Sequence, residues 1–171
     1  AMLLAVVSCS TPASQSEEIT LEEIAAQLLL LDDNILKIQA ESPTTGDGQP
    51  RVIPRTINKD GSLSVLPAGD WTSGFYPGVL WYMYELTGEA EWKDKAVKYT
   101  ATLEAQHFNG SNHDVGFRMF CSYGNALRLT GDTSYIAVLE QSAKTLISRY
   151  YEHVGCIRSW HFNEENWQCP V

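Results

Sequence analysis

The sequence LTGEAEW (residues 86–92) recurs as LTGDTSY (residues 129–135), at a spacing of 43 residues. In each copy a glycine, which can adopt the left-handed conformation, is placed to end one helix. The acidic residue that follows it suits the start of the next helix, where the helix dipole is positive. The two copies therefore predict two tight turns, each between consecutive helices.

The segments around these turns differ in their apolar patterns. Residues 75–86 and 117–129, which precede the turns, are apolar on most sides, as expected of helices that are buried all round. The segments that follow the turns are amphipathic. Their apolar faces comprise Trp92, Ala96, Tyr99 and Leu103 in the first, and Tyr135, Leu139, Ser142 and Leu146 in the second. The pattern predicts a repeated hairpin with an inner, buried helix and an outer, half-exposed helix.

Repeated hairpins of this kind form either an open solenoid or a closed ring of hairpins, the (α/α) barrel. The period of 43 residues is too long for a tetratricopeptide array, and the inner helices are more apolar than the concave face of a solenoid usually is. The ring fits better, and we predict an all-α fold. A ring of six hairpins at this period needs more than the 171 residues present, so we expect an incomplete barrel, truncated at Val171.

Two further elements are predicted ahead of the hairpins. The capping box TLEE at residues 20–23 opens a helix over residues 20–40. The apolar face of this helix comprises Ile24, Leu28, Leu31, Ile35 and Ile38. Residues 51–68 then contain two short β-prone pieces around a turn, and Pro54 and Pro67 keep these pieces from being central strands of a sheet. We expect a short extended flap there.

The charge balance argues against one class of partner. Lys and Arg together number 12 and Asp and Glu 21, which gives a formal net charge of -9, and no basic run interrupts this balance. Nucleic acid is therefore a poor candidate, because phosphate binding needs clustered Lys and Arg. An anionic sugar stays possible, since a pocket can be locally basic inside an acidic protein.

The amino-terminal sequence AMLLAVVSC is a short apolar stretch that ends in a small residue and a cysteine. Its last four residues, 6–9, match a bacterial lipobox, and the polar residues 10–18 suit a tether better than a buried strand. We interpret residues 1–18 as a lipoprotein signal remnant and linker, with Cys9 as the lipidation site, and residues 19–171 as the folded domain. The protein is then expected in the periplasm or cell envelope, and only its lipid anchor would contact a membrane.

The remaining cysteines, Cys121, Cys156 and Cys169, match no zinc pattern. A disulfide between Cys156 and Cys169 is compatible with an oxidising compartment, and a buried, inert thiol is an equally good explanation for each residue. We assign them no chemistry.

Two loops are predicted to lie at one end of the fold, because equivalent points of stacked hairpins line up. They are DWTSGF (residues 70–75) and HDVGF (residues 113–117), which precede the two inner helices. Together they supply a Trp, a His and two carboxylates. Sugar sites use this mixture, because an aromatic face stacks on the sugar ring and carboxylates act as acid, base or hydroxyl acceptor.

Each of these residues also has a structural explanation. Asp70 and Asp114 could cap the helices that follow them, and for Asp70 capping is the better explanation. Trp71 could belong to the core. His113 could simply orient its neighbour in the loop. Both motifs are short and permissive, so neither loop is distinctive by itself.

Longer strings carry a resemblance to a known family. GDWTSGFYPGVLWYMYELTG (69–88), NHDVGFRMFCSYGNALRLTGD (112–132) and IRSW (157–160), with the final PV, closely resemble the unsaturated glucuronyl hydrolases of glycoside hydrolase family 88. The resemblance runs from about residue 21 to residue 171. It implies a six-hairpin (α/α) barrel that removes the 4,5-unsaturated uronate which polysaccharide lyases leave at the non-reducing end of oligosaccharides.

The resemblance also implies a reaction unlike ordinary glycoside hydrolysis. An aspartic acid protonates C4 of the vinyl ether, water adds at C5, and the resulting hemiketal opens and expels the neighbouring sugar. Such an acid holds its proton near neutral pH when burial or a nearby carboxylate raises its pKa. By resemblance, Asp114 is the catalytic aspartate that lies beside the substrate and pairs with the proton donor. Trp71 and His113 match substrate-binding positions, and no metal or organic cofactor is implied.

In the family, the second aspartate, which serves as general acid and base, follows shortly after the position of Val171. We therefore expect the parent protein to be a hydrolase and this chain alone to be nearly inactive. One alternative is an unsaturated rhamnogalacturonyl hydrolase, which shares the barrel and the hydration chemistry. Another is a lipid-anchored carbohydrate-binding protein of helical repeats. A purely structural scaffold ranks last, because scaffolding alone does not explain two matched loops with Asp and aromatic residues.

Overall fold

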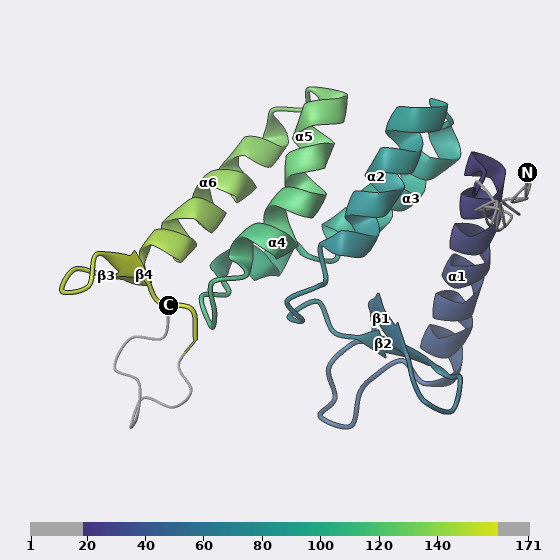
Figure 1. Cartoon of the computed structure of the whole chain (residues 1–171), viewed down its shortest axis with the longest axis horizontal. Helices are drawn as coiled ribbons and strands as arrows, with labels where there is room; N and C mark the ends of the chain where they lie inside the picture. Colours follow the sequence, from purple (N-terminus) through teal and green to yellow (C-terminus); the bar gives the residue numbers. More distant parts are fainter. Residues whose placement is uncertain (1–18, 161–171) are drawn as a thin grey trace, which may run out of the picture.

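A computed structural model describes residues 19–160 of the chain. Cys9 and Cys169 lie outside the described residues, so lipidation of the first and a disulfide from the second stay predictions. The elements are α1 (Leu21–Glu41), β1 (Ile53–Ile57), β2 (Leu63–Leu66), α2 (Phe75–Thr87), α3 (Ala90–Ala101), the 3₁₀ helix η1 (Glu104–Phe108), α4 (Val115–Met119), the π-helical turn η2 (Phe120–Gly124), α5 (Asn125–Thr130), α6 (Ser134–Ile147), β3 (Tyr150–Tyr151) and β4 (Cys156–Ile157). The helical hairpins follow one another across the molecule, from α1 on one side, through α2 with α3 and then α4 with α5, to α6 and a small β-hairpin on the other (Figure 1).

Helix α1 begins where the capping box predicts. The Glu23 N–H donates to Thr20 Oγ1 (3.2 Å), and the Thr20 N–H donates to Glu23 Oε2 (2.8 Å). The predicted apolar face is correct at Ile35, which is fully buried, but wrong at Ile24, which is exposed. Leu28, Leu31 and Ile38 of the predicted face are partly buried against the core, and near the start of the helix Leu21 and Ala25 pack there in place of Ile24.

A buried polar contact anchors α1 to the first hairpin. The side chain of Asp32 is 3% exposed, and its carboxylate accepts hydrogen bonds from Lys95 Nζ (2.6 Å) and from the Tyr99 hydroxyl (2.5 Å) of α3. Burial alone would raise the pKa of Asp32, but the hydrogen bonds from Lys95 and Tyr99 lower it below its ordinary value. The Tyr99 ring also packs edge-on against Tyr76 of α2, with 4.8 Å between the ring centroids. The contact therefore reaches both helices of the hairpin.

Residues 51–68 form the predicted flap. Strand β1 pairs antiparallel with β2, from Ile53 opposite Leu66 to Ile57 opposite Leu63, and the register shifts just after Pro54. The two strands make a sheet of their own, so the proline does not interrupt a larger ladder. Ile53 faces the core and is almost completely buried.

Both predicted turns between helices are confirmed. Gly88 ends α2 with a φ of 70° and Gly131 ends α5 with a φ of 69°, a conformation that glycine adopts without a Cβ clash. The outer helices bury the predicted faces. The first face comprises Trp92, Ala96, Tyr99 and Leu103, each at most 2% exposed, and the second is buried at Leu139 and Ser142.

Equivalent positions of the two inner helices meet across the hairpins. A Cβ placed on Gly74 would lie 2.1 Å from the carbonyl oxygen of Phe117, so only glycine permits this backbone contact. At the other end of the helices, the Arg128 guanidinium donates to both carboxylate oxygens of Glu85, at 2.6 and 2.7 Å. The two residues of each pair are 43 positions apart in the sequence, which is the period of the repeat. The two hairpins therefore stack in register.

The second inner helix is not continuous, contrary to the prediction. The π-helical turn η2 separates α4 from α5. Ser122 Oγ donates to the carbonyl of Arg118 (2.6 Å) and Asn125 Nδ2 donates to the carbonyl of Cys121 (2.9 Å), so side chains satisfy carbonyls beside the widened turn. Gly78 of α2 lies against this turn, where a Cβ would be 2.9 Å from the Cys121 oxygen. The interruption thus lies where the two inner helices approach closely.

The composition of the inner helices predicted burial all round, and this prediction is wrong. One stripe of α2 is exposed along its whole length: Phe75, Val79, Tyr82 and Leu86. On the second inner helix, Phe117 and Phe120 are exposed as well. Within residues 19–160 each inner helix is covered by its outer partner and its neighbouring hairpin, and no further element covers this stripe.

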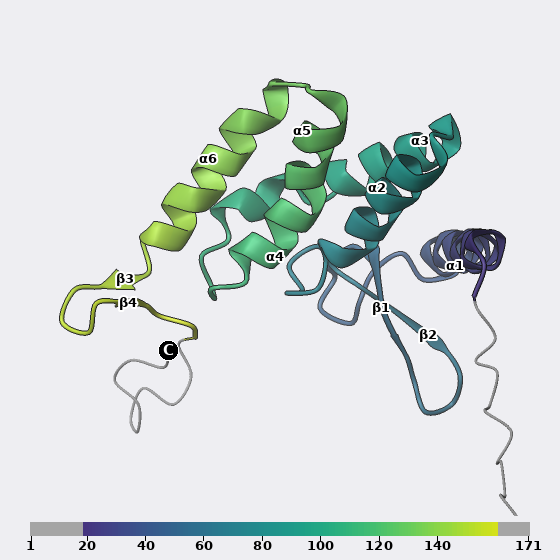
Figure 2. The same ribbon diagram turned by 45° about the horizontal axis from the view of Figure 1, so that its top comes forward.

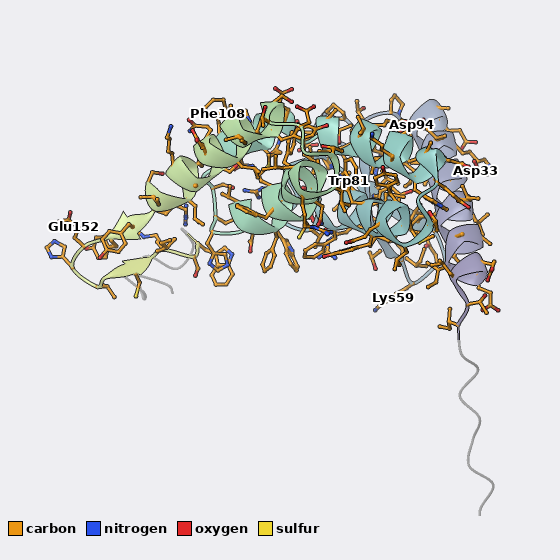
Figure 3. The ribbon with its side chains drawn as sticks, turned by 90° about the horizontal axis from the view of Figure 1, so that it is seen from above. Asp33, Lys59, Trp81, Asp94, Phe108 and Glu152 are labelled. Carbon is orange, nitrogen blue, oxygen red and sulfur yellow. The ribbon has the colours of Figure 1, made fainter. Side chains whose placement is uncertain are left out.

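The core lies between the hairpins and the flap. Trp81 of α2 is fully buried near the middle of the molecule, where helices surround it (Figure 3). Its indole N–H donates to Thr100 Oγ1 at 3.0 Å, which satisfies the one polar group of the side chain. Among the described residues, no helix combines the length and the apolar character needed to cross a bilayer. Helices build the core, as the all-α prediction requires.

A short hairpin after α6 was not predicted. Strand β3 pairs with β4, and Gly155 turns between them with a φ of 72°. Within residues 19–160 neither Cys156 of β4 nor Cys121 of η2 forms a disulfide, and burial raises the pKa of the Cys121 thiol, which fits the inert role considered for it.

Candidate active site

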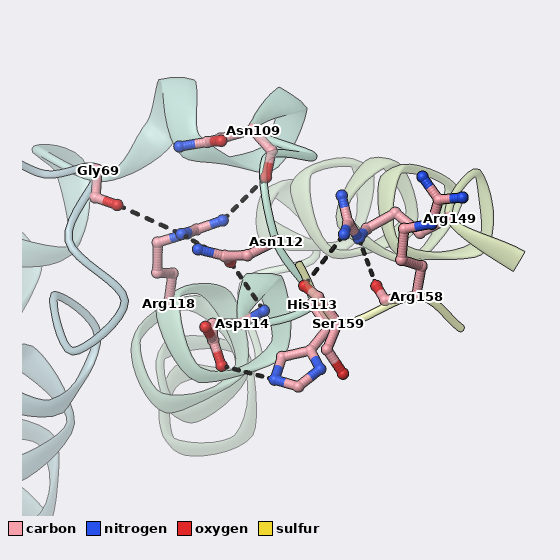
Figure 4. A network of polar contacts seen from close by, with 9 residues as sticks. All are labelled: Gly69, Asn109, Asn112, His113, Asp114, Arg118, Arg149, Arg158 and Ser159. Carbon is pink, nitrogen blue, oxygen red and sulfur yellow. Dashed lines mark hydrogen bonds and ion pairs between the residues drawn. The ribbon is translucent and has the colours of Figure 1, made fainter. Parts of the chain in front are cut away.

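The loops that precede the two inner helices lie at the same end of the helices, together with the flap and the β3–β4 hairpin (Figure 2). Arg118 of α4 joins the loops directly. Its Nη1 donates to the carbonyl of Gly69 (3.3 Å) and its Nη2 to the carbonyl of Asn109 (2.8 Å), as Figure 4 shows. The structure thus brings together the two segments that the sequence predicts to meet.

Asp114 lies at the start of α4 but does not cap it. Its carboxylate makes no capping hydrogen bond to the helix, although the residue is only 7% exposed. Instead, Asp114 Oδ1 lies 3.2 Å from Nε2 of His113, and the Asp114 N–H donates to Asn112 Oδ1 (3.0 Å). Capping therefore does not explain this aspartate, and its carboxylate is oriented by a neighbouring imidazole.

His113 is held in place from two sides. Its backbone N–H donates to the carbonyl of Ser159 (3.0 Å), and its ring packs against Trp160 with 4.9 Å between the centroids. Arg149 fixes that segment in turn, because its guanidinium donates to the carbonyls of Ser159 (3.0 Å) and Arg158 (2.7 Å). The residues after β4 therefore support the histidine that orients Asp114.

Asp70 has a structural role, but the prediction that it caps the following helix is wrong. Its Oδ1 accepts from the Thr72 N–H (2.9 Å) and from the Thr72 hydroxyl (2.5 Å), and lies 3.4 Å from Nε of Arg55. Residues 71–74 form an extra turn, and the N-cap position of α2 falls on Gly74, which has no side chain. The carboxylate thus stabilises the turn before the helix.

Trp71 is not a core residue, because 41% of its surface is exposed. Its ring meets Phe75 and Phe117 edge-on, at centroid distances of 5.9 and 6.1 Å, and these two rings lie 5.6 Å apart. The Arg55 guanidinium lies 5.5 Å from the centroid of the Trp71 ring. We call Trp71, Phe75 and Phe117 the aromatic cluster. It offers partly exposed aromatic faces from both loops.

Positive charge lies close to the two aspartates. Arg118 is fully buried, and burial lowers the pKa of its guanidinium below the ordinary value, while Asp114 and Asp70 act in the opposite direction. Burial and the neighbouring Arg158 likewise lower the pKa of Arg149, which Asp114 partly offsets. The guanidinium of arginine keeps its charge at neutral pH. The carboxylate of Asp114 therefore lies in a positive local field.

Sequence reasoning missed two residues of this region. The sequence pattern places Arg118 in an apolar helix, and the signal for a special role is a single arginine among apolar and aromatic neighbours. Trp160 lies in the string IRSW, and the resemblance of this string to the family implies no role for the residue. Both were missed because their contacts are with segments far away in the sequence.

No protein-family model matches the chain. Among proteins of known sequence, the unsaturated glucuronyl hydrolase of Formosa agariphila is 37% identical to it over 169 residues, which cover 96% of this chain and 40% of that relative. The chain thus spans about two-fifths of the length of this relative.

Two crystal structures are similar as well. One is an unsaturated glucuronyl hydrolase specific for heparin, which is 40% identical with a TM-score of 0.67, over 85% of this chain and 37% of that one. The other is the unsaturated glucuronyl hydrolase of Bacillus sp. GL1, responsible for the degradation of glycosaminoglycan. It is 25% identical with a TM-score of 0.67, over 86% of this chain and 38% of that one. These neighbours are (α/α) barrels, so the hairpins described here form part of such a barrel.

Proposed function

The chain belongs to the unsaturated glucuronyl hydrolase family, and from this premise we propose that the protein containing it is a glycoside hydrolase acting on unsaturated uronates. Its substrates are oligosaccharides that polysaccharide lyases release, and the product is the 4,5-unsaturated uronic acid from their non-reducing end. Because the chain covers only 40% of the Formosa agariphila relative, the activity is proposed for the full-length protein.

One observation carries this proposal within the chain. The carboxylate of Asp114 is almost buried and takes no part in capping, yet it is oriented by His113, whose ring packs against the partly exposed Trp160. A carboxylate held in this way is typical of a group that works on a sugar, where a nearby aromatic face binds the ring. The similarity to relatives with the same named activity supports the same reading.

The reaction is the hydration of a vinyl ether. A proton adds to C4, water adds its oxygen to C5 and releases a proton, and the hemiketal opens so that the bond to the neighbouring sugar breaks. In this scheme Asp114 is the carboxylate beside the substrate that pairs with the proton donor. Trp71 supports the sugar ring, and His113 keeps the Asp114 carboxylate in position through the 3.2 Å contact. No step of this scheme calls for a metal or an organic cofactor.

The test is turnover of an unsaturated glucuronyl disaccharide by the full-length protein, followed as loss of the ultraviolet absorbance of its double bond. We expect Asp114→Asn to lower kcat by about 1000-fold, within the range of general acid–base catalysis. Asp70→Asn is the matched control, because it alters the equivalent loop, and it should keep kcat within about threefold. Absence of turnover by the wild-type protein would refute the proposal.

A binding protein is the remaining alternative from another class. It would retain the disaccharide in a binding experiment and would leave the double bond intact. Equal disaccharide binding by the wild-type protein and Asp114→Asn, without turnover by either, would identify this case. The same absorbance assay, repeated with other unsaturated oligosaccharides, measures the substrate range. An unsaturated rhamnogalacturonyl oligosaccharide is one of these test sugars.

A further inference from the structure

Arg118 is a buried cation at the junction of the two loops. It is 0% exposed, and its guanidinium reaches Gly69 on one side and Asn109 and Asn112 on the other (Figure 4). Gly69 lies two residues before Trp71, at the start of the first loop. The side chain therefore connects one loop with the other through the protein interior.

The connection continues to the catalytic carboxylate. Asn112 Oδ1 accepts from Arg118 Nη1 (3.4 Å) and from the backbone N–H of Asp114 (3.0 Å), so one amide oxygen serves both residues. The loop that carries Asp114 is thus bonded to Arg118 at Asn109 and Asn112, and Arg118 is bonded to the loop that carries Trp71.

A buried guanidinium is an unfavourable choice for packing alone. Within residues 19–160 no carboxylate forms an ion pair with Arg118, and its Nε–H is buried with no acceptor among the described residues. A buried charge without a close partner is destabilising, and an apolar side chain of similar volume would avoid that. The position therefore calls for a reason other than stability.

We propose that Arg118 is a positioning residue that sets the spacing between the loop of Trp71 and the loop of His113 and Asp114. This inference rests on the proposed function, because the spacing matters only if both loops contact one substrate. The two terminal nitrogens diverge, so that Nη1 reaches Gly69 while Nη2 reaches Asn109. Lysine offers a single nitrogen and cannot hold both carbonyls in this way.

The kinetic test compares Arg118→Met with Arg118→Lys in the full-length protein. We expect Arg118→Met to lower kcat/KM by about 100-fold, because a misplacement of about 1 Å in a site can have that effect. KM should rise and kcat should fall together, since one loop carries Trp71 and the other carries Asp114. Arg118→Lys should recover only part of the loss. A change in KM alone, or full recovery by Lys, would overturn the proposal.

Arg128→Met is the matched control. Arg128 joins the same two inner helices to each other at their opposite end, through Glu85, and is partly exposed. Its removal should lower stability slightly and leave kcat/KM within about twofold. If Arg118→Met behaves like this control while still folded at the assay temperature, Arg118 has only a structural role and the proposal fails.

Hydrogen exchange in the full-length protein gives a readout that does not depend on turnover. We expect Arg118→Met, or Arg118→Lys if the first variant does not fold, to speed exchange in both loops, at residues 69–73 and 109–114, while Arg128→Met leaves them unchanged. Unchanged exchange in both loops would overturn the proposal. If the wild-type protein has no hydrolase activity but the loops loosen as expected, the proposed function fails while the loop-spacing role of Arg118 stands.

Discussion

The two loops that lead into the inner helices carry similar residues, yet they use their aspartates differently. Asp70 accepts hydrogen bonds from Thr72 and so stabilises the turn before α2. Asp114 stands at the start of α4 without capping it, and its carboxylate faces His113 instead. A repeated motif therefore does not repeat its role. The aspartate without a local structural task is the one available for chemistry.

The two hairpins differ in their anchors as well. The first is tied to α1 by the buried pair of Asp32 and Lys95. The second is held to the first by the backbone contact at Gly74 and by Arg128 with Glu85. Substitutions in one hairpin or one loop at a time test these differences.

The largest effect is expected at the anchor of the first hairpin. Asp32→Asn leaves Lys95 without its buried carboxylate, and the free energy of unfolding should fall by about 3 to 5 kcal/mol. The pKa of Asp32 is lowered in the folded state, so this contribution is present above the ordinary aspartate pKa and is lost as the pH falls through the folded-state pKa. Urea unfolding at neutral and acidic pH measures it. The gap between wild type and variant should shrink in acid, and a gap independent of pH would contradict this account.

The next effect concerns the contact between the hairpins. Gly74→Ala places a Cβ 2.1 Å from the carbonyl oxygen of Phe117, so the backbone must move and stability should fall by about 2 to 3 kcal/mol. Gly116 holds the matching place before phenylalanine in the second loop, where an added Cβ would meet no atom within 4 Å. Gly116→Ala should therefore stabilise α4 by about 0.5 to 1 kcal/mol. Equal destabilisation by both substitutions, measured by urea unfolding, would rule out the close approach as the cause.

A smaller effect is expected for substrate binding by the aromatic cluster. Trp71→Ala should raise KM about tenfold in the full-length protein, with little change in kcat, because it removes the exposed face that we propose supports the sugar ring. Trp71→Phe keeps an aromatic ring and should restore most of the affinity. Steady-state kinetics with the unsaturated disaccharide measures both variants. A fall in kcat with unchanged KM would argue against a binding role.

The smallest effect belongs to the first aspartate. Asp70→Asn weakens the acceptor of two hydrogen bonds in the turn before α2, and should lower the free energy of unfolding by about 1 kcal/mol. Asp114→Asn should change stability less than this, because its carboxylate caps nothing. Thermal unfolding of both variants, side by side, measures the difference. The opposite order would reverse the roles assigned to the two loops.

Much of the fold follows from local sequence signals. The capping box at Thr20, the glycines at 88 and 131 and the apolar faces of the outer helices were all predicted, because each depends on a few neighbouring residues. The β3–β4 hairpin and the π-helical turn were not. The π-helical turn lies where α2 comes close at Gly78, and the hairpin is supported by contacts of Arg149 with the segment after β4.

The candidate site was predictable to a lesser degree. The sequence alone identifies the two loops that form it, because the hairpin period brings both to one end and the long motifs match a known family, but it does not single out Arg118 or Trp160. Only the tertiary structure decided what each residue does there. Asp70 binds Thr72, Asp114 is left for His113, and Arg118 joins the loops across 49 residues of sequence. Periodicity and turn signals are encoded locally, whereas the partner of a side chain depends on which distant segment packs beside it.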